Sequence, residues 1–454
     1  MEAIIILFLT GIIALFLGIL KQPKLTTVVS LIGLVTAAII QFFPLDFLSD
    51  KYNILRFGDA GNAFEGLAIL ITGLIILTGD KGFQEDKSHV GDYQALLLFS
   101  LSGGIILLGF QDIFMFFLGL EILSIPLYVL AGAKRQSKES SEAAVKYFFM
   151  GAFATCLLLF GVALVYGSTQ SFELDKILEF TAKNPIGPMF YVGLLFILAS
   201  FLFKVGAAPF HFWVPDVYQG SPTVFMGYMS SVVKLVGVFA FVKFFQIAFV
   251  NVHEFWTILI AVLIAISMFI GNLSALVQTK FKRLLAYSSI TNGSYALMSI
   301  LYPGSVQDSS LWIFMVGYGL SVVALITIST IVNDESDEIS SLKGIGYKNP
   351  LIGLVAIVAL LSTSGIPPFT GFFGKLMIFS AVWVNYPWLI ILALINSAIG
   401  VYIYLRLIMT ILSKENSETT SKFSITILHQ GVLVSCLVIL TFGWVFLAFW
   451  KLFR

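Results

Sequence analysis

Residues 199–223 read Ala-Ser-Phe-Leu-Phe-Lys-Val-Gly-Ala-Ala-Pro-Phe-His-Phe-Trp-Val-Pro-Asp-Val-Tyr-Gln-Gly-Ser-Pro-Thr. The stretch begins as an apolar helix, meets Lys204 and is interrupted at Pro209. A charge at membrane depth costs at least about 2.5 kcal/mol on insertion scales. A broken helix at that depth also needs its freed backbone groups to be satisfied by protein or water. Two such costs in one place indicate a functional element rather than a plain membrane anchor.

The composition is that of a polytopic membrane protein. Of the 454 residues, 58% are hydrophobic and 11% are charged, whereas soluble domains carry about 25% charged residues. Cys156 and Cys436 lie in apolar runs and have neither metal-ligand spacing nor a disulfide framework. The sequence has no glycine-rich nucleotide loop, cysteine cluster or haem motif. We therefore expect this chain to bind no nucleotide, flavin, iron–sulfur cluster or metal of its own.

Long apolar runs predict an all-α membrane protein with about fourteen transmembrane helices. A spanning helix needs about 20 apolar residues, and most connections between the runs are short. The candidate spans are residues 3–20, 26–44, 62–79, 93–109, 111–131, 143–167, 187–208, 222–249, 255–278, 284–302, 310–332, 350–380, 385–412 and 426–450.

The basic residues support this count and indicate an orientation. Cytoplasmic connections of membrane proteins carry an excess of lysine and arginine. If the N-terminus is outside, 14 of the 26 Lys and Arg residues fall in inward connections, 6 fall in outward segments and 6 fall within the spans. We therefore expect fourteen spans with both termini on the outer side. The six basic residues within the spans are Lys146, Lys204, Lys234, Lys243, Lys375 and Arg406.

Glu121 and three lysines are the candidate proton carriers. An opposite charge within about 4–6 Å favours a charged lysine, and desolvation favours the neutral form. A Lys204 balanced between the two by Glu121 could load and release a proton; the alternative for Glu121 is a helix-packing ion pair. Lys234 lies in mid-helix, and Lys375 follows a second break at residues 364–374, which contain two prolines and three glycines. Intramembrane ionisable residues of this kind favour a functional reading.

Four further residues have alternative interpretations. Lys146 lies four residues after Glu142, which suits either an ordinary ion pair at a helix boundary or an auxiliary relay. His211 either passes a proton between its ring nitrogens or caps carbonyls freed by the break. Lys243, near a helix end, is expected to extend toward the interface. Arg406 cannot titrate usefully and is expected to pair or anchor.

A polar run lies inside the tenth span. It could line a hydrated path, or it could make hydrogen bonds between helices. The run comprises Tyr287, Ser288, Ser289, Thr291 and Asn292.

The two broken spans predict an inverted repeat. They are the seventh and the twelfth, and an offset of five makes corresponding helices cross in opposite directions. Paired interrupted spans are typical of such repeats, with the ion path at the repeat interface. The match is imperfect, because Lys204 precedes its break and Lys375 follows its own. We expect residues 1–92 to form helices 1–3, 93–249 the first repeat (helices 4–8), 250–412 the second repeat (helices 9–13) and 413–454 helix 14.

Residues 203–223 resemble the signature of the antiporter-like subunits of respiratory complex I. That family includes the large subunits of multisubunit cation/proton antiporters and of membrane-bound hydrogenases. Two segments are similar to its subunit N branch: Pro-Asp-Val-Tyr-Gln-Gly-Ser-Pro-Thr at 215–223 and Gly-Ile-Pro-Pro-Phe-Thr-Gly-Phe-Phe-Gly-Lys at 365–375. With the fourteen expected helices, the resemblance covers essentially the whole chain.

The resemblance implies proton translocation, driven by electron transfer from NADH to quinone elsewhere in NADH–quinone oxidoreductase, a translocase. Glu121 matches the family's fifth-helix glutamate, and Lys204 matches the paired lysine on the broken seventh helix. Lys234 matches the central lysine of helix 8, and Lys375 the terminal lysine of helix 12. Lys146 is similar to an auxiliary lysine on helix 6.

The resemblance also implies where the chain works. NADH, FMN, iron–sulfur clusters and quinone would be bound by other subunits of the complex. The expected partners are other membrane-arm subunits, including a sister antiporter-like subunit and small membrane subunits, together with lipid and without nucleic acid. The expected location is the bacterial inner (plasma) membrane.

Two other functions fit parts of this pattern. A subunit of a multisubunit cation/proton antiporter would share the Glu–Lys core but exchange Na⁺ or K⁺. Sodium prefers carboxylate and carbonyl oxygens, and the predominance of basic residues in the spans favours protons. A purely structural subunit is disfavoured, because a scaffold could place leucine at the four central charged positions.

Overall fold

The computed structural model describes residues 1–42, 54–82, 89–302, 309–332, 336–413 and 425–445, and this part is almost wholly helical. Within it, extended pairing is limited to three isolated β-bridges. The expected all-α fold is confirmed. Its physical reason is that a helix satisfies its backbone hydrogen bonds within one segment, as a lipid environment requires.

Helices stand at all fourteen expected positions. The N-terminal group is α1 (Glu2–Ile19), α2 (Pro23–Phe42) and α3 (Asp59–Gly82). The next group is α4 (Val90–Gly109), α5 (Ile113–Ala131), α6 (Lys138–Thr169), a short connecting α7 (Leu174–Lys183), α8 (Pro188–Val205), α9 (Trp213–Gly220), α10 (Thr223–Tyr228) and α11 (Lys234–Ala248). The last group is α12 (His253–Leu276), α13 (Phe281–Leu297), α14 (Ser309–Val332), α15 (Ile345–Lys348), α16 (Pro350–Ser364), α17 (Thr370–Trp383), α18 (Pro387–Leu412) and α19 (Ile427–Phe442).

Twelve helical segments in the described part are long and apolar enough to cross a membrane, and α10 and α11 form one of them through a π-helical turn at Met229–Val233. The other two expected spans have local explanations. α16 and α17 are shorter apolar helices that together replace the expected span 350–380, because the chain breaks between them. α13 takes the tenth position and carries the expected polar run, which lowers its hydropathy.

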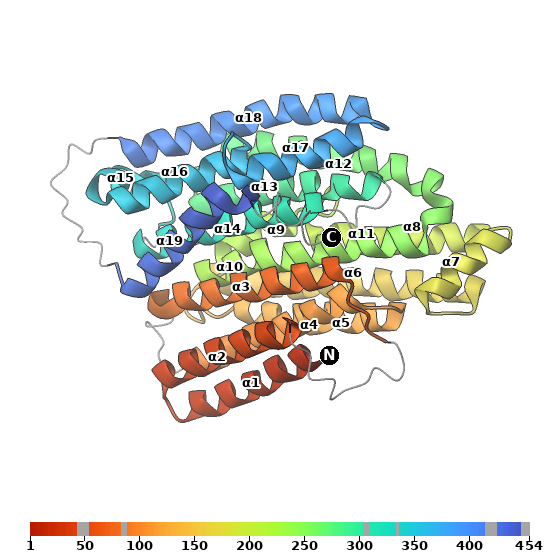
Figure 1. The fold of residues 1–454 in the computed structure, drawn as a ribbon, viewed down its shortest axis with the longest axis horizontal. Helices are drawn as coiled ribbons and strands as arrows, with labels where there is room; N and C mark the ends of the chain where they lie inside the picture. Colours follow the sequence, from red (N-terminus) through yellow and green to blue (C-terminus); the bar gives the residue numbers. More distant parts are fainter. Residues whose placement is uncertain (43–53, 83–88, 303–308, 333–335, 414–424, 446–454) are drawn as a thin grey trace.

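The helices lie side by side in one bundle, with α1 and α2 at one edge and α18 at the other (Figure 1). Burial follows this order. In the most apolar stretch of α14, 94% of the residues are buried, and in that of the α10–α11 span 89% are buried. The corresponding share is 28% in α1 and in α2. The interior therefore lies along α10, α11 and α14, and the chain places Lys234 at that centre.

Corresponding connections of the two five-helix groups pair in the same way. An antiparallel bridge joins Asp112, after α4, to Glu173, after α6. Another joins Lys280, after α12, to Glu338, after α14. These are the same two connections in each predicted repeat, and they support the inverted five-helix repeat.

Candidate functional site

The first break follows a helix end closed by a glycine. α8 stops at Val205, and Gly206 adopts a left-handed φ of 74° that a side chain would disfavour. Beyond a cis Ala208–Pro209 bond the chain resumes as α9. Protein groups satisfy the freed backbone: Ser267 Oγ accepts from Ala208 N at 2.8 Å, and Trp213 Nε1 donates to the Phe203 carbonyl at 3.0 Å. The break is thus a built element.

The second break repeats this arrangement. α16 ends at Ser364, and Gly365 has a left-handed φ of 83°. In both breaks the glycine N–H and the next N–H fold back onto the last helical turn, with Ala207 donating to Leu202 and Ile366 donating to Leu361. A cis Pro367–Pro368 bond precedes α17. The similarity predicted from prolines and glycines is therefore a similarity of local structure.

Lys204 contacts hydroxyl groups of α5. Its Nζ donates to Ser124 Oγ at 2.8 Å and to Tyr128 OH at 3.3 Å. The expected direct pair with Glu121 is absent among the described contacts, because the ammonium lies about one helical turn along α5 from that carboxylate. Glu121 Oε1 instead accepts from Thr155 Oγ1 of α6 at 2.7 Å. Residues 121, 124 and 128 share one face of α5, so the acid and the lysine remain neighbours without direct contact.

Lys234 lies at the centre of the bundle. It begins α11 directly after the π-helical turn, and only 4% of it is exposed. Such π-helical turns occur frequently at functional sites. The Nζ donates to Ser289 Oγ at 2.8 Å and to the Ser289 carbonyl. A Cβ at Gly293 would approach Nζ to 3.0 Å, so this glycine makes room for the lysine.

Lys375 reaches back across the second break. Its Nζ donates to the carbonyls of Thr363 at 2.7 Å and Ser364 at 3.0 Å, and it lies 4.8 Å from the ring centre of Tyr295. Those carbonyls end α16, where the helix dipole favours a cation. Lys204 likewise lies over a tyrosine, Tyr128, at 5.9 Å. Each lysine therefore lies near a tyrosine ring, but the half-buried Lys204 bonds hydroxyl groups whereas the buried Lys375 bonds helix-ending carbonyls.

A set of polar contacts joins α13 to α18 beside Lys375. Ser288 Oγ and Tyr404 OH lie 2.5 Å apart, and Asn292 Nδ2 contacts both, at 3.3 Å in each case. Tyr295 OH lies 3.2 Å from Ser397 Oγ and accepts from Asn396 Nδ2 at 2.8 Å. A small polar cavity is lined by nine residues including Asn272, Thr291, Asn292, Tyr295, Lys375 and Tyr404.

This network favours the path interpretation of the tenth-span polar run. Ser289 contacts Lys234, and Thr291 and Asn292 line the cavity that contains Lys375. Residues of the run also make the hydrogen bonds between helices that were the alternative interpretation, since Ser288 and Asn292 both contact Tyr404 of α18.

His211 and Lys146 lie apart from this network. His211 is 6% exposed, and its Nδ1 makes no hydrogen bond in the described part of the chain. Lys146 pairs with Glu142 at 2.7 Å, as expected, and with Asp216 at 2.7 Å. Because Asp216 lies on α9, Lys146 ties α6 to the segment after the first break.

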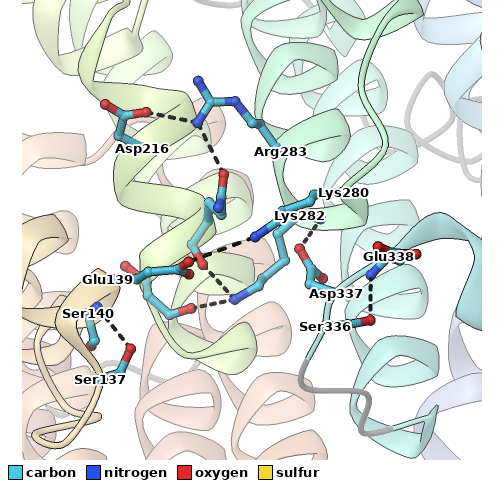
Figure 2. A network of polar contacts seen from close by, with 12 residues as sticks. Ser137, Glu139, Ser140, Asp216, Lys280, Lys282, Arg283, Ser336, Asp337 and Glu338 are labelled. Atoms are coloured by element: carbon cyan, nitrogen blue, oxygen red, sulfur yellow. Dashed lines mark hydrogen bonds and ion pairs between the residues drawn. The ribbon is translucent and has the colours of Figure 1, made fainter.

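A charged cluster at the start of α13 completes this end of the bundle (Figure 2). Arg283 donates to Asp216 Oδ1 at 2.9 Å, and Lys280 lies 3.8 Å from Glu139. Burial alone would raise the pKa of Asp216, but hydrogen bonds and charges from Lys146 and Arg283 outweigh it and hold that pKa below its ordinary value. Neither Asp216 nor Arg283 was predicted from the sequence as a site residue. The sequence signal of Asp216 was a charge beside a broken helix, and that of Arg283 was its place among the basic residues of an inward connection.

Glu65 is a second acid that sequence reasoning missed. It lies seven residues into α3 and is 4% exposed. The sequence feature that could have identified Glu65 is a single carboxylate within the expected span 62–79. The described residues contain no group of three or more His, Cys, Asp or Glu side chains suited to a metal ion.

We expect Asp216→Asn to lower the free energy of unfolding by about 1 kcal/mol, because it removes the charge that joins α6, α9 and α13. The native pKa of Asp216 lies below its unfolded value. Its contribution is therefore complete at neutral pH and is lost as the pH falls below about 4. Thermal unfolding of the purified complex between pH 8 and 5 should show a constant difference from wild type. Glu179→Gln, at the exposed pair with Lys183, is the matched control. A difference that disappeared by pH 6 would contradict this assignment.

Comparisons with known proteins agree with this geometry. Residues 111–441 match the family described as NADH:quinone oxidoreductase/Mrp antiporter, TM. The chain is 33% identical over 445 residues to NADH-quinone oxidoreductase subunit N of Flavobacterium psychrophilum, with 97% of each chain covered. It is 35% identical to the subunit N of Cytophaga hutchinsonii, with 92% of each covered.

Solved structures resemble the chain over nearly its full length. A chain of respiratory complex I from Thermus thermophilus superposes with a TM-score of 0.81 at 30% identity, covering 97% of this chain and 96% of that one. A chain of an archaeal membrane-bound sulfane sulfur reductase superposes with a TM-score of 0.85 at 24% identity, covering 100% and 96%. The second likeness concerns the fold alone.

Proposed function

Because the chain belongs to the NADH-quinone oxidoreductase subunit N family, we propose that it translocates protons in the membrane arm of that translocase through a chain of Glu121, Lys204, Lys234 and Lys375 within its spans. One observation carries the proposal. Lys234 is buried at the bundle centre and bonds Ser289, and two later residues of the same α13 run, Thr291 and Asn292, line the cavity that Lys375 also lines. A proton needs such a relay to cross an apolar interior.

The proposed switch is the position of the Lys204 ammonium. Its present partners are the neutral hydroxyls of Ser124 and Tyr128, while Thr155 holds Glu121. Moving the ammonium about one turn along α5, to Glu121, would favour the charged lysine. Returning it would favour proton release toward Lys234. A tenfold change in proton affinity requires only about 1.4 kcal/mol, which one gained or lost ion pair can supply.

Lys146 and His211 are proposed as auxiliary residues. Lys146, through Asp216, holds α9 against α6, and His211 lies inside the first break. Movement of the break would change both environments. Their proposed role is to position the break, with proton passage through His211 as the second possibility.

The setting of the subunit follows from the family. Its relatives are named as parts of NADH-quinone oxidoreductase, so we infer partners among the membrane-arm subunits. NADH, FMN, iron–sulfur and quinone sites are assigned to other subunits. The proposed location is the bacterial inner membrane with both termini outside, on the distribution of basic residues. The proposed units are residues 1–92, 93–249, 250–412 and 413–454.

A cation/proton antiporter is the competing function, because the matching family description also includes Mrp antiporters. The contacts favour protons. Lys234 and Lys375 fill the central sites with ammonium donors, whereas a sodium site needs several oxygen ligands free of a competing cation. Proton pumping by the purified complex that is independent of added sodium would support this choice.

Lys204→Ala tests the proposed function. We expect the variant complex to assemble and oxidise NADH while pumping at least about tenfold more slowly, since relays of this kind contribute 10²-fold or more. The measurement is acidification of liposomes that contain the purified complex, normalised to NADH oxidation. Lys176→Ala, at an exposed pair with Glu173, is the control and should pump normally. Full pumping by Lys204→Ala would refute the proposed function, which passes protons through Lys204.

A further inference from the structure

Lys243 and Arg406 occupy equivalent places in the two repeats. Lys243, on the last helix of the first repeat, donates to the Leu108 carbonyl near the end of α4 at 3.1 Å. Arg406, on the last helix of the second repeat, donates to the carbonyls of Leu276 and Gln278 at the end of α12, each at 3.0 Å. α4 and α12 are the first helices of their repeats. In each repeat, a cation of the last helix therefore caps the first helix.

The inverted topology places the two cations at opposite ends of the bundle. In the proposed orientation α4 ends on the outer side, because it is the fourth span, and α12 ends on the inner side, because it is the ninth. Lys243 thus lies toward the outer end of the first repeat, and Arg406 toward the inner end of the second. The expectation that Lys243 extends to the interface is wrong: only 5% of it is exposed.

The side chains around the Lys243 ammonium are apolar. Its Nζ lies 4.7 Å from the ring centre of Phe110, which packs against Phe116 and Phe244. All three rings are buried. The inner end of the same repeat is different, because Lys146 and Asp216 are 39% and 36% exposed in their side chains. The inner end of the first repeat therefore carries half-exposed charged side chains, whereas the Lys243 ammonium, toward the outer end, lies among buried aromatic rings.

Arg406 lies close in sequence to residues that line the cavity of the second repeat. Tyr404 and Asn272 line that cavity. Arg406 lies two residues after Tyr404, and its acceptor Leu276 lies one turn after Asn272. In the proposed orientation, the direction from Tyr404 to Arg406 along α18 and the direction from Asn272 to Leu276 along α12 both point toward the inner side. The half-buried guanidinium therefore lies on the inner side of the cavity that Lys375 lines.

We propose that Lys243 and Arg406 are paired cationic barriers that close the outer end of the first repeat and the inner end of the second to protons. The carbonyls that end a helix, and for Lys243 an aromatic face, stabilise the charged side chain in place. A fixed positive charge in a narrow path repels a second cation. Protons entering one repeat must then pass through the central lysines to leave by the other. This inference rests on the proposed function.

The experiment measures passive proton leak, without NADH, in liposomes that contain the purified complex. Lys243→Gln keeps a donor for the Leu108 carbonyl and removes the charge, and Lys243→Arg keeps both. We expect about a tenfold faster collapse of an imposed pH gradient for the glutamine variant, equivalent to about 1.4 kcal/mol of barrier, and no change for the arginine variant. Lys176→Gln is the matched surface control.

Several results would overturn the barrier. A leak in Lys243→Gln equal to wild type, or an equal rise in Lys243→Arg, would show that charge is not what stops the proton. Arg406→Gln should leak and Arg406→Lys should not, and this pair decides the matter if Lys243 variants do not assemble. The leak needs no turnover, so it is read separately from the pumping of Lys204→Ala. Normal pumping in that variant would refute the proposed function and leave the leak result standing.

Discussion

Replacing Lys234 by methionine should reduce proton pumping by about 10²-fold or more, the usual contribution of a positioned proton-transfer group. Methionine fills the buried site without a charge, so packing around α11 should survive. Ser289 would lose its ammonium partner, and the proposed path toward Lys375 would lose its proton donor at that end. The measurement is the ratio of protons moved to NADH oxidised in liposomes that contain the purified complex.

Two variants refine this result. Lys234→Arg keeps a positive charge that does not release a proton at physiological pH, so it should also fail to pump. Gly293→Ala places a methyl group 3.0 Å from the lysine Nζ and should reduce pumping less than Lys234→Met does. It also provides a test that keeps the lysine if Lys234→Met does not assemble. A wild-type ratio in Lys234→Met or Lys234→Arg would remove Lys234 from the path.

Replacing Lys375 by methionine should have two separable effects. Pumping should fall by about 10²-fold or more, because the last titratable group of the proposed chain is lost. Stability should fall by about 1–3 kcal/mol, because the carbonyls of Thr363 and Ser364 lose a charged donor while buried. Pumping is measured as above, and stability by thermal unfolding of the purified complex.

Lys375→Arg separates these effects. It retains donors for the end of α16 and does not titrate, so stability should return while pumping stays low. Trp213 offers a structural comparison, because its Nε1 donates to the end of α8 in the first repeat without carrying a proton. Trp213→Phe should therefore cost stability and spare pumping. Pumping restored by Lys375→Arg would show that Lys375 only supports the break.

Much of the fold was predictable from local sequence properties. Hydropathy located fourteen spans, because in lipid each spanning segment must make its backbone hydrogen bonds within itself as an apolar helix. Prolines and glycines located both breaks, and Gly206 and Gly365 have the left-handed conformation such helix ends require. The proposed site residues Lys204, Lys234 and Lys375 stood out because a charge within an apolar run is costly.

The contacts of those residues were less predictable. Lys204 was expected to meet Glu121, but it reaches Ser124 and Tyr128, about a turn away. A shift of one turn leaves the hydropathy pattern unchanged, so the sequence could not distinguish the two. Lys243 was expected to reach the interface and is buried, because the end of α4 lies within reach of its ammonium.

By itself, the sequence determined which segments cross the membrane, where two of them break and which charges they bury. These properties depend on residues within one helix and on its transfer from water to lipid. The tertiary structure alone decided which oxygen each cation contacts, that Asp216 joins Lys146 to Arg283, and that Lys243 and Arg406 are counterparts. The contacts of Asp216, Lys243 and Arg406 join residues 67 to 135 positions apart. They depend on how helices are rotated and placed against one another, which side-chain packing decides and a single helix does not encode.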